Sequence, residues 1–164
     1  MNRSTVLHPF PPVADARSRV LILGSFPSVQ SRSDGFYYGH PQNRFWKMLA
    51  LVFHTTPPVT HQEKSELLLQ HHLALWDAAA SVSIEGSSDS SIRQVIPVRL
   101  EQVFSIAPVE RILCNGALAG RLYAQYLEAD TGIHAKVLPS TSPANAAWTL
   151  TRLTEAWAPW LQKA

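Results

Sequence analysis

The 164-residue sequence contains one cysteine, Cys114, and no apolar run of the roughly 18 residues that a membrane-spanning helix needs. A single cysteine excludes an internal disulfide and any metal or iron–sulfur site built from several thiolates. Residues 1–18 hold no continuous apolar stretch after Arg3, so we expect no secretory signal and interpret this segment as an extended lead-in. These absences favour a reducing, cytoplasmic setting.

The sequence also has little net charge and lacks the common enzyme motifs. The formal charge is +2, too small to argue for a nucleic-acid partner by itself, although it permits a local basic face. No G-x-S-x-G, G-x-G-x-x-G or G-x-x-x-x-G-K-[ST] pattern occurs, so no nucleophile elbow and no nucleotide phosphate loop is indicated. His61, His71 and His72 do not have the spacing of metal ligands, and we expect them to be surface residues.

Short apolar segments alternate with amphipathic ones along the chain, which predicts a parallel sheet with helices on both faces. The strand-like segments are RVLILG, LALWD, RILCNG and AKVL. The helix-like segments are NRFWKMLALVF, a stretch that starts at Thr60 with Glu63 as reciprocal cap, PVRLEQVFSI, ALAGRLYAQYLEAD, and the tail from Ala146. The polar stretch AASVSIEGSSDSSI is predicted to be a loop. We expect one α/β domain over residues 1–164.

In such sheets, functional groups gather in the loops after the carboxyl ends of the strands. Three of these loops stand out: the one after Gly24, the one at Asn115–Gly116, and the one from Pro139. They are rich in asparagine, serine, proline and aromatic residues. Aromatic faces suit a flat heterocycle, and asparagine amides both donate and accept hydrogen bonds. The alternative is that the aromatic run 36–38 only covers the core.

Motifs in these loops resemble the uracil-DNA glycosylase superfamily. GSFPS, GFYYGHPQNRFW and LPSTSPAN follow one another in the family order, and the resemblance spans about Arg19 to Trp148. HPQNRFW is similar to the mismatch-specific uracil/thymine glycosylases, and its combination with SSDSSI is most similar to the hypoxanthine (deoxyinosine) DNA glycosylase branch.

This resemblance implies a three-layer α/β/α sandwich around a short, mostly parallel central sheet. It also implies an enzyme that hydrolyses the N-glycosidic bond of a deaminated base, hypoxanthine first, flipped out of DNA. No metal and no organic cofactor is expected. The expected partner is DNA that contains such a base, and the expected oligomeric state is a monomer. The motifs contain no lysine that could form a Schiff base, which favours a monofunctional glycosylase.

The family motifs assign roles to individual residues. In most branches an asparagine or aspartate two positions after the first glycine holds the attacking water, but this chain has Phe26 there, and the resemblance implies Asn43 instead. The second motif usually begins with histidine or asparagine, where this chain has Leu138, and Asn145 offers an amide nearby. Tyr38 matches the aromatic residue that stacks on the flipped base.

Three sets of site residues follow. The residues expected to act in catalysis are Asn43, Asn145 and Ser140. Those expected to contact the flipped base are Gly24, Ser25, Phe26, Tyr38 and His40. Those expected to bind DNA are Arg44, Lys47, Ser140, Thr141, Ser142 and Pro143, the last four in a loop that would enter the minor groove.

Several alternatives remain open at this point. Asn43 and Asn145 each precede a predicted helix, so either one could be a helix cap. Arg44 and Lys47, one helical turn apart, could be a solvated pair. The enzyme could act mainly on uracil or on a G:T or G:U mismatch, or the domain could bind nucleic acid without catalysis. A small serine esterase is the remotest option.

Overall fold

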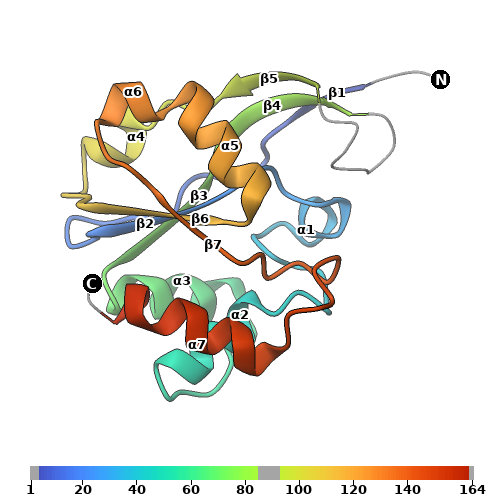
Figure 1. Cartoon of the computed structure of the whole chain (residues 1–164), viewed down its shortest axis with the longest axis vertical. Helices are drawn as coiled ribbons and strands as arrows, with labels where there is room; N and C mark the ends of the chain where they lie inside the picture. Colours follow the sequence, from blue (N-terminus) through green and yellow to red (C-terminus); the bar gives the residue numbers. More distant parts are fainter. Residues whose placement is uncertain (1–3, 85–92, 163–164) are drawn as a thin grey trace.

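The computed structural model describes residues 4–84 and 93–162 (Figure 1). The strands are β1 (Ser4–Leu7), β2 (Val20–Gly24), β3 (Leu73–Asp77), β4 (Ala79–Ile84), β5 (Arg93–Pro97), β6 (Arg111–Asn115) and β7 (Lys136–Leu138). The helices are α1 (Val29–Asp34), α2 (Phe45–Val52), α3 (His61–Gln70), α4 (Glu101–Phe104), α5 (Ala117–Tyr126), α6 (Glu128–Thr131) and α7 (Leu150–Leu161).

The central sheet has the strand order β3-β2-β6-β7, and each neighbouring pair is parallel. Helices α2, α3 and α7 cover one face of this sheet, and α4, α5 and α6 cover the other (Figure 1). Because both faces are covered, β2 and β3 are buried at every position and consist almost entirely of apolar residues. The three-layer α/β/α prediction is therefore confirmed.

The predicted polar loop over AASVSIEGSSDSSI is wrong in its first half, which forms β4. This strand lies in a second, antiparallel sheet with the order β1-β4-β5. The extended lead-in supplies β1, whose backbone pairs with β4 from Leu7 opposite Ser81 to Ser4 opposite Ile84. The serine-rich composition concealed a strand whose Val82 packs against Phe26. The rest of the stretch, including SSDSSI, lies outside the described residues.

The predicted helix starts are partly confirmed. Helix α3 begins at its predicted cap, because the Thr60 hydroxyl accepts the Glu63 amide and the Glu63 carboxylate accepts the Thr60 amide. Helix α7 begins later than Ala146, since Thr149 is its cap and accepts the Arg152 amide. The Asn145 side chain is therefore not the cap of this helix. PVRLEQVFSI yields only the four-residue helix α4.

The register of the central strands brings their carboxyl ends to one edge. Gly24 at the end of β2 pairs with Asp77 at the end of β3, and Asn115 at the end of β6 pairs with Leu138 at the end of β7. The loops that follow these strands therefore start side by side. None of the helices within the described ranges is long and apolar enough to cross a bilayer.

Candidate active site

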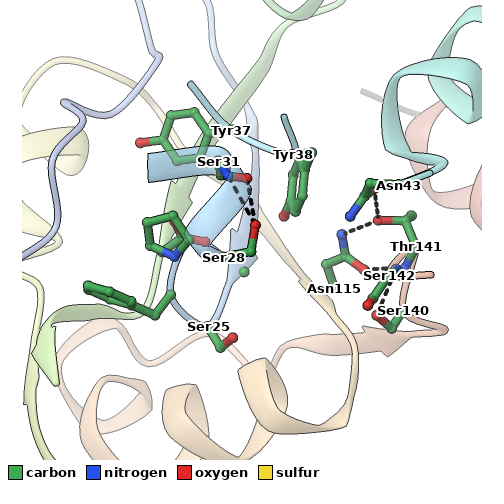
Figure 2. A pocket seen from close by; sticks show the side chains of 14 residues that line it. Ser25, Ser28, Ser31, Tyr37, Tyr38, Asn43, Asn115, Ser140, Thr141 and Ser142 are labelled. Carbon is green, nitrogen blue, oxygen red and sulfur yellow. Dashed lines mark hydrogen bonds between the residues drawn. The ribbon is translucent and has the colours of Figure 1, made fainter. Parts of the chain in front are cut away.

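A pocket opens at this edge of the sheet, between the loop that follows β2 and the loop that follows β7 (Figure 2). The first loop brings aromatic rings and an amide to it, and the second brings hydroxyl groups. The lining residues are Gly24, Ser25, Phe26, Pro27, Ser28, Ser31, Tyr37, Tyr38, Asn43, Asp77, Asn115, Ser140, Thr141 and Ser142. The tips of loops that are more than a hundred residues apart in sequence thus meet around one cavity.

The three consecutive aromatic residues divide between the core and the pocket. Phe36 stacks on His61 and Trp46, and Tyr37 is buried with its hydroxyl donating to the Pro11 carbonyl. Phe36 therefore fits the core-covering alternative, whereas Tyr37 is buried and also lines the pocket. Tyr38 lines the pocket and lies near Phe45, with the ring centroids 4.3 Å apart. Its backbone is left-handed at φ 54°, an uncommon conformation outside glycine.

The Tyr38 hydroxyl is buried and makes no hydrogen bond to the described residues. Burial, with a smaller contribution from the charge of Asp77, raises the pKa of this phenol well above its usual value. The same two causes raise the pKa of Tyr37. Both tyrosines are therefore neutral at physiological pH, and Tyr38 offers the pocket an uncharged aromatic surface.

Asn43 presents a hydrogen-bond donor to the pocket. Its Oδ1 accepts the backbone amide of Phe45 at 2.9 Å and the hydroxyl of Thr141 at 2.9 Å. The Phe45 contact fixes the orientation of the amide, because a backbone N–H must face the oxygen. Both lone pairs of Oδ1 are thus occupied, and the NH₂ group points toward the cavity (Figure 2). The side chain thus accepts the first amide of α2 from the position before the N-cap residue Arg44, and it also lines the pocket.

Asn115 and Thr141 lock β6 to the loop after β7. The Asn115 Nδ2 donates to the Thr141 hydroxyl at 3.0 Å, and the Thr141 amide donates to Asn115 Oδ1 at 3.0 Å. Thr141 is fully buried and donates in turn to Asn43. One buried threonine therefore sets the relative positions of the two asparagine amides.

Arg44 stabilises the loop after β7 by hydrogen bonds to the backbone carbonyls of that loop. Its Nη2 donates to the carbonyls of Ser142 at 2.8 Å and Asn145 at 3.1 Å, its Nε donates to Thr141, and its Nη1 donates to Trp148. The guanidinium is thus engaged with backbone carbonyls and is not the solvated group of the alternative interpretation. A phosphate contact by Arg44 remains a prediction.

We expect Arg44→Lys to lower the melting temperature. A lysine has a single nitrogen in place of the planar fork, so it leaves several loop carbonyls without a donor. The matched variant is Lys47→Ala, which removes an exposed cation from α2, three residues after Arg44, and should leave the melting temperature unchanged. Thermal unfolding followed by circular dichroism measures the melting temperature of both variants. A melting temperature of Arg44→Lys equal to that of the wild type would contradict the stabilising role of the Arg44 hydrogen bonds.

The other predicted site residues lie at different distances from the cavity. Ser140 lines it, and its hydroxyl accepts the Ser142 amide. Asn145 lines an adjoining hollow that shares Ser140 with the pocket, and its Nδ2 donates to the Ser140 carbonyl. The residues predicted for the site that do not line the pocket are Asn145, His40, Arg44, Lys47 and Pro143.

His40 shapes the turn that leads to Asn43. Its Nδ1 accepts the Gln42 amide, and its carbonyl accepts the Asn43 amide. Contact between the His40 ring and a substrate remains a prediction.

Sequence reasoning missed Asp77, and although it singled out the loop at Asn115–Gly116, it gave Asn115 no role in the site. Each is the last residue of an apolar strand, LALWD or RILCN, and that position at the carboxyl end of a parallel strand was the available signal. It also missed Ser28 and Ser31, which hydrogen-bond to each other in the first turn of α1.

The pocket offers hydrogen-bond donors, hydroxyls and one carboxylate. Over residues 4–84 and 93–162, no three histidine, cysteine, aspartate or glutamate side chains gather as metal ligands. The lining residues include no lysine. The arrangement suits a planar group held against Tyr38, with charge developing near the Asn43 amide.

Comparison with known proteins agrees with this geometry. The model of the uracil DNA glycosylase superfamily matches residues 11–162. The chain belongs to this superfamily. It is therefore an enzyme of the DNA glycosylase type, and DNA is its substrate class.

The chain is also similar to two curated proteins and to one solved structure. A hypoxanthine DNA glycosylase of Methanosarcina acetivorans is 34% identical over 148 residues, 89% of this chain and 92% of that protein. A hypoxanthine DNA glycosylase of Methanosarcina barkeri is 34% identical over 138 residues, 83% of this chain and 86% of that protein. The solution NMR structure of a uracil DNA glycosylase candidate from Methanosarcina acetivorans superposes with a TM-score of 0.80, at 33% identity, over 94% of this chain and 95% of the other.

Proposed function

We propose that this glycosylase is monofunctional and hydrolyses the N-glycosidic bond of hypoxanthine in DNA, as a monomer in the cytoplasm. The observation that carries the proposal is the amide NH₂ of Asn43, which has no hydrogen-bond partner among residues 4–84 and 93–162 and lines one pocket together with the ring of Tyr38. The names of the two Methanosarcina relatives support hypoxanthine as the base.

The first step is binding of a base that has left the DNA stack. The glycosidic bond is inaccessible inside a duplex, so the nucleotide must flip into the pocket. A base lying on Tyr38 gains about 1–3 kcal/mol from stacking, and Phe45 supports the tyrosine ring from behind. The hydroxyl-rich segment 140–142 also lines the pocket.

The second step is departure of the base. Cleavage makes the sugar oxocarbenium-like and leaves a negative charge that hypoxanthine delocalises onto its carbonyl oxygen. The Asn43 NH₂ is a fixed donor for that charge, and a lost donor of this kind costs about 3–4 kcal/mol in the transition state. Because Asn43 Oδ1 already accepts two hydrogen bonds, we assign Asn43 to the leaving base and not to the attacking water.

The enzyme acts without lyase chemistry in this proposal. Strand cleavage by a bifunctional glycosylase requires an amine that attacks the sugar, and no lysine lines the pocket. Water is the nucleophile, so the product is an intact abasic site.

The test is incubation with duplexes that carry a single deoxyinosine, deoxyuridine or deoxyxanthosine. We expect strand breaks at deoxyinosine after alkali treatment and none before it, with slower release of the other bases. Faster release of uracil opposite guanine would replace this proposal with a uracil or mismatch glycosylase. Binding to inosine DNA without alkali-labile sites would point to a catalytically silent binding domain.

A further inference from the structure

Asp77, which lines the pocket, forms a buried pair with His8, which does not line it. His8 Nε2 lies 2.8 Å from Asp77 Oδ2, and the two side chains are 5% and 4% exposed. His8 Nδ1 accepts the Phe10 amide, so the proton of the neutral imidazole is on Nε2 and is donated to Asp77. His8 follows β1 and packs against the rings of Phe10, Phe26 and Tyr37. The pair therefore holds the carboxylate in one orientation.

The second oxygen of Asp77 faces Gly24. A Cβ on Gly24 would overlap Asp77 Oδ1 and would lie 2.9 Å from the Tyr38 hydroxyl, so both groups converge on the space that the missing side chain leaves. Among the described residues, none donates a hydrogen bond to Oδ1. A planar ring that lies on Tyr38 and extends past its hydroxyl therefore brings one edge to this carboxylate.

Deamination creates a ring N–H group that Asp77 Oδ1 can accept as a hydrogen-bond donor. Conversion of adenine to hypoxanthine replaces the amino group by a carbonyl and places a hydrogen on the neighbouring ring nitrogen, N1. Conversion of cytosine to uracil does the same at N3. An ionised carboxylate only accepts hydrogen bonds. It matches the ring N–H of the deaminated base and opposes the lone pair that the undamaged parent carries at the same position.

We propose that Asp77 is a specificity-determining residue whose Oδ1 accepts the ring N–H of the deaminated base, so that adenine is rejected. The inference rests on the proposed function and adds the group that distinguishes damaged from undamaged bases.

The remaining polar groups of the pocket support this assignment. Asn43 has both lone pairs of its oxygen occupied, and Asn115 uses its nitrogen and its oxygen in bonds to Thr141. A carboxylate next to an anionic leaving base is unfavourable unless it accepts a hydrogen bond from that base. Asp77 therefore belongs at the N–H edge, and the Asn43 donor belongs at a carbonyl.

The test is Asp77→Asn, measured by single-turnover release of hypoxanthine and of adenine from otherwise identical duplexes. The asparagine oxygen would take the His8 hydrogen bond and turn the NH₂ group toward the base. We expect the ratio of the hypoxanthine rate to the adenine rate to fall by about 10- to 100-fold. An unchanged ratio, including an equal loss of both rates, would overturn the inference.

The matched control is Asp34→Asn, which makes the same change in an exposed aspartate–histidine pair outside the pocket. Asp34 Oδ2 lies 3.3 Å from His61 Nε2, and the histidine and aspartate side chains are 50% and 38% exposed. The rate ratio of this variant should equal that of the wild type. A fall as large as that of Asp77→Asn would show that the effect does not depend on the pocket and would refute the proposal.

A modified substrate tests the contact between Asp77 and the ring N–H in the wild-type enzyme. This test does not depend on whether Asp77→Asn folds. N1-methyl-deoxyinosine has no ring N–H, so we expect its base to be released at least about tenfold more slowly than hypoxanthine. Equal release would overturn the inference.

A measurement of DNA binding without cleavage tests the role of Asp77 independently of the proposed function. In 2′-fluoro-deoxyinosine the glycosidic bond resists cleavage, so affinity for a duplex containing it can be compared with the 2′-fluoro-deoxyadenosine duplex. If wild-type enzyme does not release hypoxanthine, the proposed function fails. A preference for the inosine duplex that Asp77→Asn abolishes would then still support the recognition role, and no preference would remove it.

Discussion

Asn43→Ala is expected to reduce the single-turnover rate of hypoxanthine release by about 100- to 1000-fold, the effect of losing one donor to a developing anion. The substitution also removes the acceptor for the Phe45 amide at the start of α2 and for the Thr141 hydroxyl. Loss of a cap costs about 1 kcal/mol of stability, so the melting temperature should fall while the protein still folds. Rapid-quench release assays and thermal unfolding measure the two effects.

Asn43→Asp separates the two roles of this side chain. The aspartate keeps an acceptor for Phe45 and Thr141 but has no N–H, and it adds a negative charge beside the leaving base. We expect a melting temperature close to that of the wild type and activity as low as that of Asn43→Ala. Activity within about tenfold of wild type would contradict the donor role, because one lost donor costs more than that, and would favour an acceptor that holds the attacking water.

Gly24→Ala is expected to abolish measurable release of the base and to destabilise the fold. The added methyl group would overlap Asp77 Oδ1, which His8 holds in place, and would approach the Tyr38 hydroxyl. Overpacking of this kind costs about 1–3 kcal/mol, and the same methyl group fills the floor of the pocket. Binding of a 2′-fluoro-deoxyinosine duplex, measured by fluorescence anisotropy, should be lost together with activity.

Gly132→Ala provides the comparison for this variant. Gly132 has φ 71° and open space around the position of a Cβ, so alanine adds backbone strain without a clash near the pocket. We expect a lower melting temperature with unchanged release of hypoxanthine. If Gly24→Ala kept the activity of Gly132→Ala at equal stability, the space beside Asp77 would have no role in binding the base.

Hydrophobic pattern was sufficient to predict the layers of the fold. The run RVLILG is too apolar for a surface strand and too short for a buried helix, and its residues Val20–Gly24 form β2 and are all buried. The capping box of α3 could also be predicted from the sequence, because both of its hydrogen bonds are made between residues three positions apart. Local spacing carries such features.

The antiparallel sheet could not be read from local spacing. β4 is rich in alanine and serine, and it becomes a strand because β5, the next strand along the chain, and β1, more than seventy positions earlier, both supply its backbone partners. Pairing over that distance leaves no trace in either segment alone. The same reason explains why Asn145 was expected in the pocket and Asp77 was not, since the pocket depends on how distant strand ends align.

The contact between His8 and Asp77 joins the pocket to a residue that lies before the region matched by the superfamily model. The superfamily match starts at residue 11, yet the imidazole that orients the carboxylate belongs to the segment before it. A protein cut at the border of the match would keep its layers and lose the partner of Asp77. If Asp77 discriminates between bases as proposed, this discrimination depends on a residue that follows the amino-terminal strand and lies outside the matched residues 11–162.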